Sequence, residues 1–366
     1  MSEKAPGRTL SSLCSCCQPG FAVTSLDAGR RRLLTGGIAS LGLGATAAFG
    51  QQTPPAPTAK TRIDVHHHYV PPFHADIMET KRSGGRPPRW TPQMSLEEMD
   101  KSGIATAIVS LVQPGAWFED DVALSRRLAR ECNDYGAKMM ADHPGRFGLF
   151  ATLPLPDTEG SLKEIEYVFD TLHADGIGLM TSYGDKWVGD PAFLPVLEEL
   201  NRRKTVVYVH PSSPLCCTSL MPYVPPFFSE FQQDTTRAIL SLIFSGSLKR
   251  LADVRFIFSH SGGTLPMVAG RIEHYAALPA FKEKVPNGFI TELKRLHYEI
   301  ANAANKPALS ALTSLVPTSQ IMFGSDFPLV SIGETAHGLM QLGFSPADFQ
   351  KIARDNALGL IPRLKA

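Results

Sequence analysis

The chain has 366 residues, of which 43% are hydrophobic and 19% are charged. This is the balance of an ordinary globular protein, and the length suffices for one large domain or two modest ones. The formal net charge of +1 leaves no basic or acidic excess, which argues against nucleic acid as a partner.

Residues 1–47 have the layout of a bacterial twin-arginine export signal. Three arginines and two leucines at 30–34 precede a run rich in glycine and alanine, and Ala45-Thr46-Ala47 fits a small-residue cleavage site. An amphipathic tail or a membrane anchor is the alternative, but the run is short beside the roughly 20 apolar residues of a bilayer span. We therefore expect a periplasmic protein without stable membrane insertion.

A proline-rich linker is expected at 48–61, followed by one folded domain at 62–366. The six cysteines do not form a disulfide framework, because three lie in the export signal and two of the others are adjacent. Those of the export signal could bind a metal, but nothing downstream completes such a site, so their role stays open: Cys14, Cys16 and Cys17.

From Arg62 onward, short apolar runs alternate with segments of helical periodicity. The runs read as strands lie at 62–68, 104–112, 147–155, 174–183, 205–211, 254–263, the second half of 292–302, and 319–328. The segments read as helices lie at 95–103, 120–144, 158–173, 191–204, 235–253, the first half of 292–302, 308–317 and 346–361. The first helix is predicted to begin at Ser95 as N-cap, with Glu98 completing a capping box, and to end at Gly103.

Eight strands, each followed by a helical segment, predict parallel strands covered by helices. Eight such strand–helix units over about 300 residues are typical of an α/β fold of the closed (β/α)8 TIM-barrel type. An open doubly wound sheet is the alternative. Its nucleotide-binding versions lose support because no glycine-rich phosphate motif follows an early strand.

Residues of metal-ligand type end four of these strands, and barrel active sites lie at the C-terminal ends of strands. The first strand ends in His66-His67-His68, and the others end in His210, His260 and Asp326. Because side chains alternate along a strand, His66 and His68 should point into the barrel mouth while His67 points toward the helices.

This arrangement predicts one divalent metal held by His66, His68, His210 and Asp326. Imidazole and carboxylate ligands suit zinc, and also manganese, iron or cobalt, of which we expect zinc first and manganese second. His260 is left over and is expected to move protons beside the metal, as Asp326 would also do.

The four motifs DVHHHYVPP, VVYVHPS, FIFSHSGGTLP and IMFGSDFP resemble the amidohydrolase superfamily. They are most similar to the amidohydrolase-related nonoxidative decarboxylases, such as the aminocarboxymuconate-semialdehyde, resorcylate and 6-methylsalicylate decarboxylases. The resemblance spans the chain from Arg62 to its end and implies the same four ligands, with His260 as the catalytic histidine.

The resemblance implies three further features. An arginine in the matching stretch contacts the substrate carboxylate, in some members across a dimer interface, which points to Arg271 and to a homodimer. Binuclear members carry a carbamylated lysine at the end of the fourth strand, whereas Met180 stands there in this chain and favours a single metal. Trp90, Trp117 and Phe118 could line an aromatic pocket, or cap the barrel as ordinary loop residues.

Two reactions fit these residues. The first is nonoxidative decarboxylation of a small aromatic or unsaturated carboxylic acid, and we expect this one. The alternative is hydrolysis of an ester, lactone or amide by metal-activated water. A third interpretation, an exported metal-binding barrel without activity, is disfavoured because all five strand-end residues are present.

Overall fold

The computed structural model of the protein describes residues 61–81, 87–119, 121–214, 216–217, 221 and 223–365. The predicted export signal, and all but the last residue of the predicted linker, lie outside these ranges. Within them, no helix is long and apolar enough to cross a membrane.

Eight parallel strands of the described chain form one sheet in the order β1-β2-β3-β4-β7-β8-β9-β10. Their bounds are β1 Arg62–Tyr69, β2 Ile104–Leu111, β3 Phe147–Thr152, β4 Gly176–Met180, β7 Val206–His210, β8 Arg255–Phe258, β9 His297–Glu299 and β10 Ile321–Met322. The sheet closes on itself, because Val65 N donates to Phe323 O at 3.0 Å and His68 N donates to Phe327 O at 2.7 Å. The predicted (β/α)8 barrel is confirmed.

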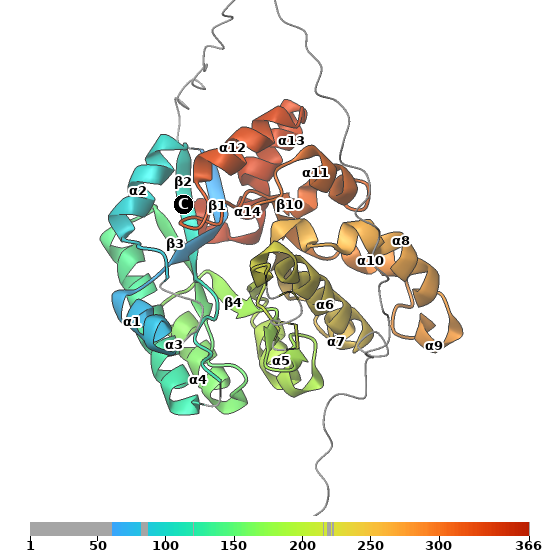
Figure 1. Ribbon diagram of the computed structural model, residues 1–366, viewed down its shortest axis with the longest axis horizontal. Helices are drawn as coiled ribbons and strands as arrows, with labels where there is room; N and C mark the ends of the chain where they lie inside the picture. Colours follow the sequence, from blue (N-terminus) through green and yellow to red (C-terminus); the bar gives the residue numbers. More distant parts are fainter. Residues whose placement is uncertain are drawn as a thin grey trace, which may run out of the picture. The chain divides into compact units, whose positions relative to one another are not determined.

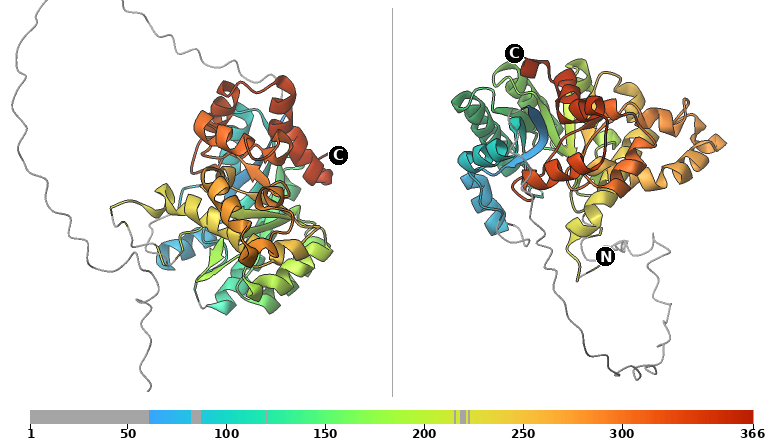
Figure 2. Two further views of the ribbon diagram at one scale, coloured as in Figure 1. Left: turned by 90° about the vertical axis from the view of Figure 1, so that its right-hand side faces the viewer. Right: turned by 90° about the horizontal axis from the view of Figure 1, so that it is seen from above.

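Helices follow the strands and form an outer layer around the barrel (Figure 1, Figure 2). The longer ones are α1 Pro72–Lys81, α2 Pro92–Lys101, α3 Val122–Asp142, α4 Thr158–Asp170, α5 Leu194–Arg202, α6 Glu230–Phe244, α8 Leu265–Ala276, α11 Lys306–Thr313 and α12 Ile332–Gln341. Short helices are α7 Ser247–Arg250, α9 Pro279–Lys282, α10 Phe289–Leu293, α13 Pro346–Gln350 and α14 Asn356–Leu360. A two-stranded hairpin, β5 Ser182–Tyr183 and β6 Lys186–Trp187, leaves the barrel after β4.

The structure corrects several helix predictions. Helix α2 begins earlier than predicted, since the Thr91 side chain caps it by accepting from Met94 N and Pro92 occupies its first turn, so Ser95 is not the N-cap. The segment predicted as one helix at 235–253 begins at Glu230 and breaks at Gly246, whose φ of 83° is left-handed. Helices α1, α8 and α12 were not among the predicted segments.

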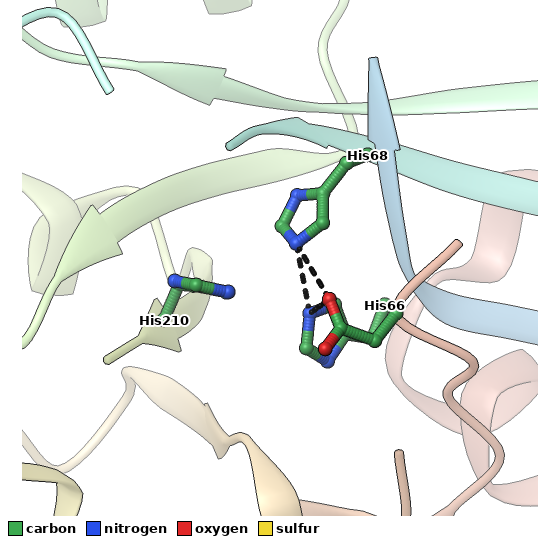
Figure 3. Close-up of side chains that lie close together, drawn as sticks. His66, His68 and His210 are labelled. Atoms are coloured by element: carbon green, nitrogen blue, oxygen red, sulfur yellow. Dashed lines mark hydrogen bonds and ion pairs between the residues drawn. The ribbon is translucent and has the colours of Figure 1, made fainter. Parts of the chain in front are cut away.

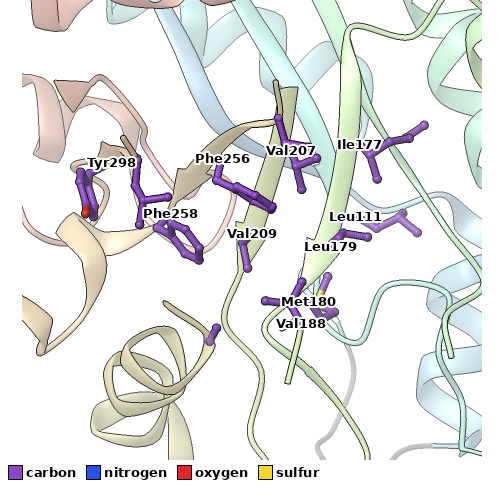
Figure 4. Close-up of a cluster of buried hydrophobic side chains, with 14 of the residues drawn as sticks. Leu111, Ile177, Leu179, Met180, Val188, Val207, Val209, Phe256, Phe258 and Tyr298 are labelled. Atoms are coloured by element: carbon purple, nitrogen blue, oxygen red, sulfur yellow. The ribbon is translucent and has the colours of Figure 1, made fainter. Parts of the chain in front are cut away.

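The barrel strands bury two apolar layers, one on each face. Inward-facing side chains fill the barrel below the site: Ile63, Val65, Ile108, Phe150, Val206, Tyr208, Ile257 and Met322. Alternate residues, such as Val207, Val209, Phe256 and Phe258, pack outward against the helices (Figure 4). Full burial of such a side chain stabilises a fold by about 1.5–3 kcal/mol, so these layers fix the strand ends rigidly.

Strand β1 contains an irregularity that sets the direction of its histidines. Ile63 and Val65 face inward, and strict alternation would therefore send His67 inward as well. The pairing with β2 shifts between Asp64 and His67, as at a β-bulge, and beyond it His66 and His68 face the barrel interior. The relative directions predicted for the three histidines are correct, but the bulge that produces them was not anticipated.

Candidate active site

Four of the predicted residues meet at one point of the barrel mouth. His66, His68, His210 and Asp326 each offer a ligand atom, and these atoms all lie within 4.8 Å of one another. All four side chains are buried. Figure 3 shows the three imidazoles converging from β1 and the end of β7. His66 Nε2 and His68 Nε2 are 3.1 Å apart, and they lie 3.2 and 3.1 Å from Asp326 Oδ1.

The far nitrogen of each imidazole is engaged by an oxygen acceptor. His66 Nδ1 donates to Glu299 Oε1 at 2.9 Å, His68 Nδ1 to Ser110 O at 3.3 Å, and His210 Nδ1 to Pro211 O at 2.7 Å. Each of these bonds places a proton on Nδ1 and turns the Nε2 lone pair toward the common centre. Three lone pairs and a carboxylate oxygen facing one another require a positive charge among them, so the donor set fits a divalent metal.

The charges around the site lead to the same conclusion. Burial opposes protonation of His66, but the carboxylates of Glu299 and Asp326 outweigh it and raise its pKa to about 10. Burial alone would raise the pKa of Asp326, but the contacts with His66 and His68 hold it well below its ordinary value. Burial, with repulsion from His68 and His66, keeps the pKa of His210 well below its usual range. A proton and a divalent metal would therefore compete for His66 Nε2.

His67 faces the helix layer, as predicted, and is part of a buried hydrogen-bonded chain. Its Nδ1 lies 3.1 Å from Asp64 Oδ2, and its Nε2 lies 2.8 Å from Ser95 Oγ on α2. Asp64 in turn accepts from Ser325 N and Ser325 Oγ, at 3.0 and 2.6 Å. This chain joins the bulged strand β1 to the loop that carries Asp326 and so positions ligands from both elements.

His260 stands beside the four ligands with one nitrogen fixed and the other open. Its Nδ1 donates to Ala301 O at 2.9 Å, and its backbone N donates to Glu299 Oε1 at 2.8 Å. Its Nε2 has no hydrogen-bond partner among the described residues, although the side chain is buried. An imidazole held in one tautomer with a free lone pair on the cavity side is suited to proton transfer.

Backbone strain is concentrated at this rim. Seven non-glycine residues of the described chain have positive φ, and four of them lie at the site: His260 (53°), Ser261 (57°), Asn302 (53°) and Asp326 (69°). Each such residue costs about 1–3 kcal/mol, so the surrounding structure must hold them in place. Asn302 uses its conformation to donate from Nδ2 to Asp326 Oδ2 at 2.6 Å.

A cavity of about 650 Å³ opens above these residues. His210, His260, Asn302 and Asp326 contribute polar groups, and Gln113 and Gln232 add two carboxamides. The rest of the wall is apolar: Met78, Pro87, Pro88, Val112, Phe227, Phe228, Phe231, Leu329 and Val330. This size and character suit a single small aromatic molecule.

Two predicted substrate contacts lie away from this cavity. Trp90 is buried, donates from Nε1 to Ser95 Oγ at 2.8 Å and packs on Tyr69 and Tyr135, so it supports α2 and does not line the wall. Arg271 is exposed on α8 and lies over the ring of Tyr275, 5.1 Å from its centroid. No lysine or arginine appears among the described residues that line the cavity.

Two supporting residues were not predicted from the sequence. Glu299 ends β9 fully buried, and it accepts from His66 Nδ1, His260 N and Ala301 N. The sequence did contain a signal for Glu299, because a carboxylate inside the apolar run LHYEI is too costly to bury without hydrogen-bond partners. Asn302 gave no such signal, because its role depends on a positive φ that its residue type alone does not announce.

A barrel with three histidines and an aspartate at its strand ends belongs to the class of metal-dependent amidohydrolase-fold enzymes. The family model described as amidohydrolase matches residues 63–363, and the chain belongs to this family, in its decarboxylase branch. The decarboxylase yanB of Aspergillus niger is 37% identical over 326 residues, which cover 83% of this chain and 88% of that protein. The 6-methylsalicylic acid decarboxylase of Penicillium expansum is 33% identical, with 83% and 97% covered.

A solved structure shares the fold. The dihydroxybenzoic acid decarboxylase of Polaromonas sp., with bound manganese and the inhibitor 2-nitroresorcinol, superposes with a TM-score of 0.72 at 22% identity. The match covers 84% of this chain and 98% of that one. The comparisons favour the predicted decarboxylase over the predicted hydrolase, and the chain is a carboxy-lyase.

Proposed function

We propose that this protein is a metal-dependent nonoxidative decarboxylase of a small hydroxylated aromatic carboxylic acid. The observation that carries the proposal is the position of the four-ligand centre: His210 and Asp326 line an apolar cavity of about 650 Å³ together with the free Nε2 side of His260. The relatives that bear the names of 6-methylsalicylic acid and dihydroxybenzoic acid decarboxylases support an aromatic acid as the substrate.

His66, His68, His210 and Asp326 would hold the metal, and zinc is our first expectation because three of the four ligands are imidazoles. Manganese is the second, since the Polaromonas enzyme binds it. The bound ion would act as a Lewis acid that stabilises negative charge on the substrate's carboxylate and neighbouring hydroxyl oxygens.

The protein's own residues would move one proton. His260 Nε2 or the Asp326 carboxylate would first take up a proton from solvent or from the substrate's hydroxyl group, and would then deliver it to the ring carbon that bears the carboxylate. The bond from this carbon to the carboxylate then breaks, its electron pair restores the aromatic ring, and carbon dioxide leaves. Asn302 holds Asp326 Oδ2 during this step, and Ala301 O holds His260 in the tautomer with Nε2 open.

The cavity walls would select the substrate. Phe227, Phe228 and Phe231 offer apolar faces to an aromatic ring, while Gln113, Gln232 and Asn302 can bind its hydroxyl groups. Gln232 Oε1 is buried without a partner among the described residues, so it is available to accept from a substrate hydroxyl.

A homodimer would supply the missing cation. Arg271 lies on α8, where the apolar side chains of Met267 and Tyr275 are 78% and 45% exposed, and Leu278 follows at 42%. A second copy packed on this face would cover it and could receive Arg271 at its cavity, where a guanidinium would bind the substrate carboxylate. Light scattering measures the assembly. Mixing inactive Arg271→Ala and Asp326→Ala proteins should restore part of the activity if the arginine acts across the interface.

We also propose export through the twin-arginine route. Replacing Arg31 and Arg32 with lysine should retain the protein in the cytoplasm, whereas the parent should fractionate with the periplasm. Equal distribution of both proteins would refute this location.

The central test combines metal content with a substrate panel. Mass spectrometry should find about one zinc or manganese per chain, and Asp326→Ala should lose it. The loaded enzyme should release carbon dioxide from 2-hydroxybenzoates and leave neutral esters intact. Glu164→Gln is the control, since this buried carboxylate pairs with Arg130 away from the site. A loaded enzyme that releases no carbon dioxide from any acid would refute the proposal.

A further inference from the structure

Asp234, a buried carboxylate on α6, is neither one of the four metal-ligand candidates nor part of the cavity wall. Asp234 has no exposed surface and does not line the cavity. Its Oδ2 accepts from Thr181 Oγ1 at 2.5 Å and from Ser182 Oγ at 3.0 Å, and its Oδ1 accepts from Trp187 Nε1 at 2.6 Å. A buried carboxylate is expensive unless its donors are fixed, so these contacts call for an explanation.

Thr181 connects Asp234 to the Pro211–Ser212 peptide group, which lies one residue beyond His210. Ser212 N donates to Thr181 Oγ1 at 2.8 Å, and Thr181 N donates to His210 O at 2.9 Å. The N–H of Ser212 and the C=O of Pro211 belong to one planar peptide unit. Thr181 therefore holds one edge of this plane while its other edge, Pro211 O, accepts from His210 Nδ1 at 2.7 Å.

The direction of each hydrogen bond in this chain is determined by Asp234. Thr181 Oγ1 donates to Asp234 Oδ2, so the single hydroxyl proton of Thr181 points toward Asp234. The lone pairs of Thr181 Oγ1 are then available to Ser212 N–H. With the plane held this way, Pro211 O faces His210 and keeps the proton of its ring on Nδ1.

We propose that Asp234 and Thr181 are positioning residues for the metal ligand His210, acting through the Pro211–Ser212 peptide. The relay runs from carboxylate to hydroxyl to peptide to imidazole, and it leaves the His210 Nε2 lone pair aimed at the metal. It extends the common pattern in which a carboxylate orients a metal-bound histidine directly. The proposal rests on the proposed function only in taking His210 as a ligand.

The geometry distinguishes this role from simple packing. Asp234 also accepts from Ser212 Oγ at 3.3 Å and lies 3.8 Å from Arg237 Nη1, so it joins the ends of β4 and β7 to α6 whatever the ligand does. Among the described side chains, however, only the Thr181 hydroxyl bonds both to Asp234 and to the backbone N–H of the Pro211–Ser212 peptide. Removing its hydroxyl while keeping its shape therefore isolates the relay.

The test uses the full-length protein and its Thr181→Val, Thr181→Ser, Asp234→Asn and Asp175→Asn variants. Zinc affinity is measured in competition with a chromogenic chelator. Histidine nitrogen chemical shifts of the metal-free proteins report the tautomer of His210. Asp175 is the matched control, because it is a buried carboxylate bonded to Arg363 and Leu149 N at the opposite end of β4.

We expect Thr181→Val and Asp234→Asn to bind zinc about tenfold more weakly and to populate the Nε2–H tautomer of His210. Thr181→Ser and Asp175→Asn should match the parent in both measurements. Parent-like affinity and tautomer in Thr181→Val would overturn the relay, as would an equal loss in Asp175→Asn. If the parent bound no zinc, the proposed function would fail, and the tautomer measurement alone would still decide the relay.

Discussion

Replacing Glu299 with glutamine should separate the charge of this residue from its shape. Its Oε1 accepts from His66 Nδ1 at 2.9 Å and His260 N at 2.8 Å, and its Oε2 accepts from Ala301 N at 2.6 Å. In Glu299→Gln, the amide oxygen can still accept from His66 Nδ1 and His260 N. The amide NH₂ group then faces Ala301 N, which is itself a donor. One buried N–H is then left unpaired, which costs about 1–3 kcal/mol of stability.

The lost charge should act on the metal and on the pH dependence of stability. Weakening a partner of a ligating histidine typically lowers metal affinity by about 10–100-fold. In the metal-free protein, Glu299 is also the first of the attractions that raise the pKa of His66 from 6.5 to about 10. A pKa raised on folding gives stability that is fully present below the unfolded value, and this stability is lost as pH rises through the folded value.

Urea unfolding of the metal-free parent and Glu299→Gln variant at pH 6 and pH 10 tests this reasoning. The difference in unfolding free energy between the parent and Glu299→Gln should be larger at pH 6, where His66 carries its proton. At pH 10 this difference should shrink toward the cost of the unpaired Ala301 N–H. Glu164→Gln serves as a control, with a gap that does not depend on His66. An equal gap for Glu299→Gln at both pH values would refute the assignment of the proton to His66.

Three further substitutions test other parts of the site. Trp90→Phe should lower stability by about 1–2 kcal/mol in thermal unfolding, because the donor to Ser95 is lost, and should leave KM unchanged. Phe228→Ala should raise KM more than it lowers kcat, since this wall residue is 67% exposed and contributes little to folding. Asn302→Gly should lower kcat without loss of stability, because it removes the bond to Asp326 and also relieves a positive φ. A changed KM in Trp90→Phe, an unchanged KM in Phe228→Ala, or an unchanged kcat in Asn302→Gly would contradict the respective role.

The barrel and its strand-end ligands could be predicted from the sequence because both follow from local patterns. Apolar strand runs ending in histidine or aspartate are short and unambiguous, and parallel strands bring their C-terminal ends together whatever the loops do. For this reason His210 and Asp326 lie close in space, although they are 116 positions apart in the sequence.

Contacts between elements could not be predicted in the same way. Ser95 resembles a helix cap in sequence, but Thr91 and Pro92 begin the helix one turn earlier and leave Ser95 to hold His67 and Trp90. Arg271 lies on α8, which contributes no residue to the cavity, so its assignment to the substrate depends on the proposed second subunit. In both cases the deciding neighbours are not adjacent in the local sequence pattern.

The strained backbone of the site could not be predicted from the sequence, although His260 and Asp326 themselves were. His260, Ser261, Asn302 and Asp326 adopt positive φ values that cost free energy, and β1 needs a bulge before His66 to turn two histidines inward. Such conformations persist only where packing and buried hydrogen bonds over-determine them. Here Glu299 and Asp64, which are both buried, and Asn302, which is exposed after β9, provide those bonds. The packing and hydrogen bonds around this rim hold the ligands and His260 in place before substrate binds, and such preorganisation would favour the proton transfer proposed above.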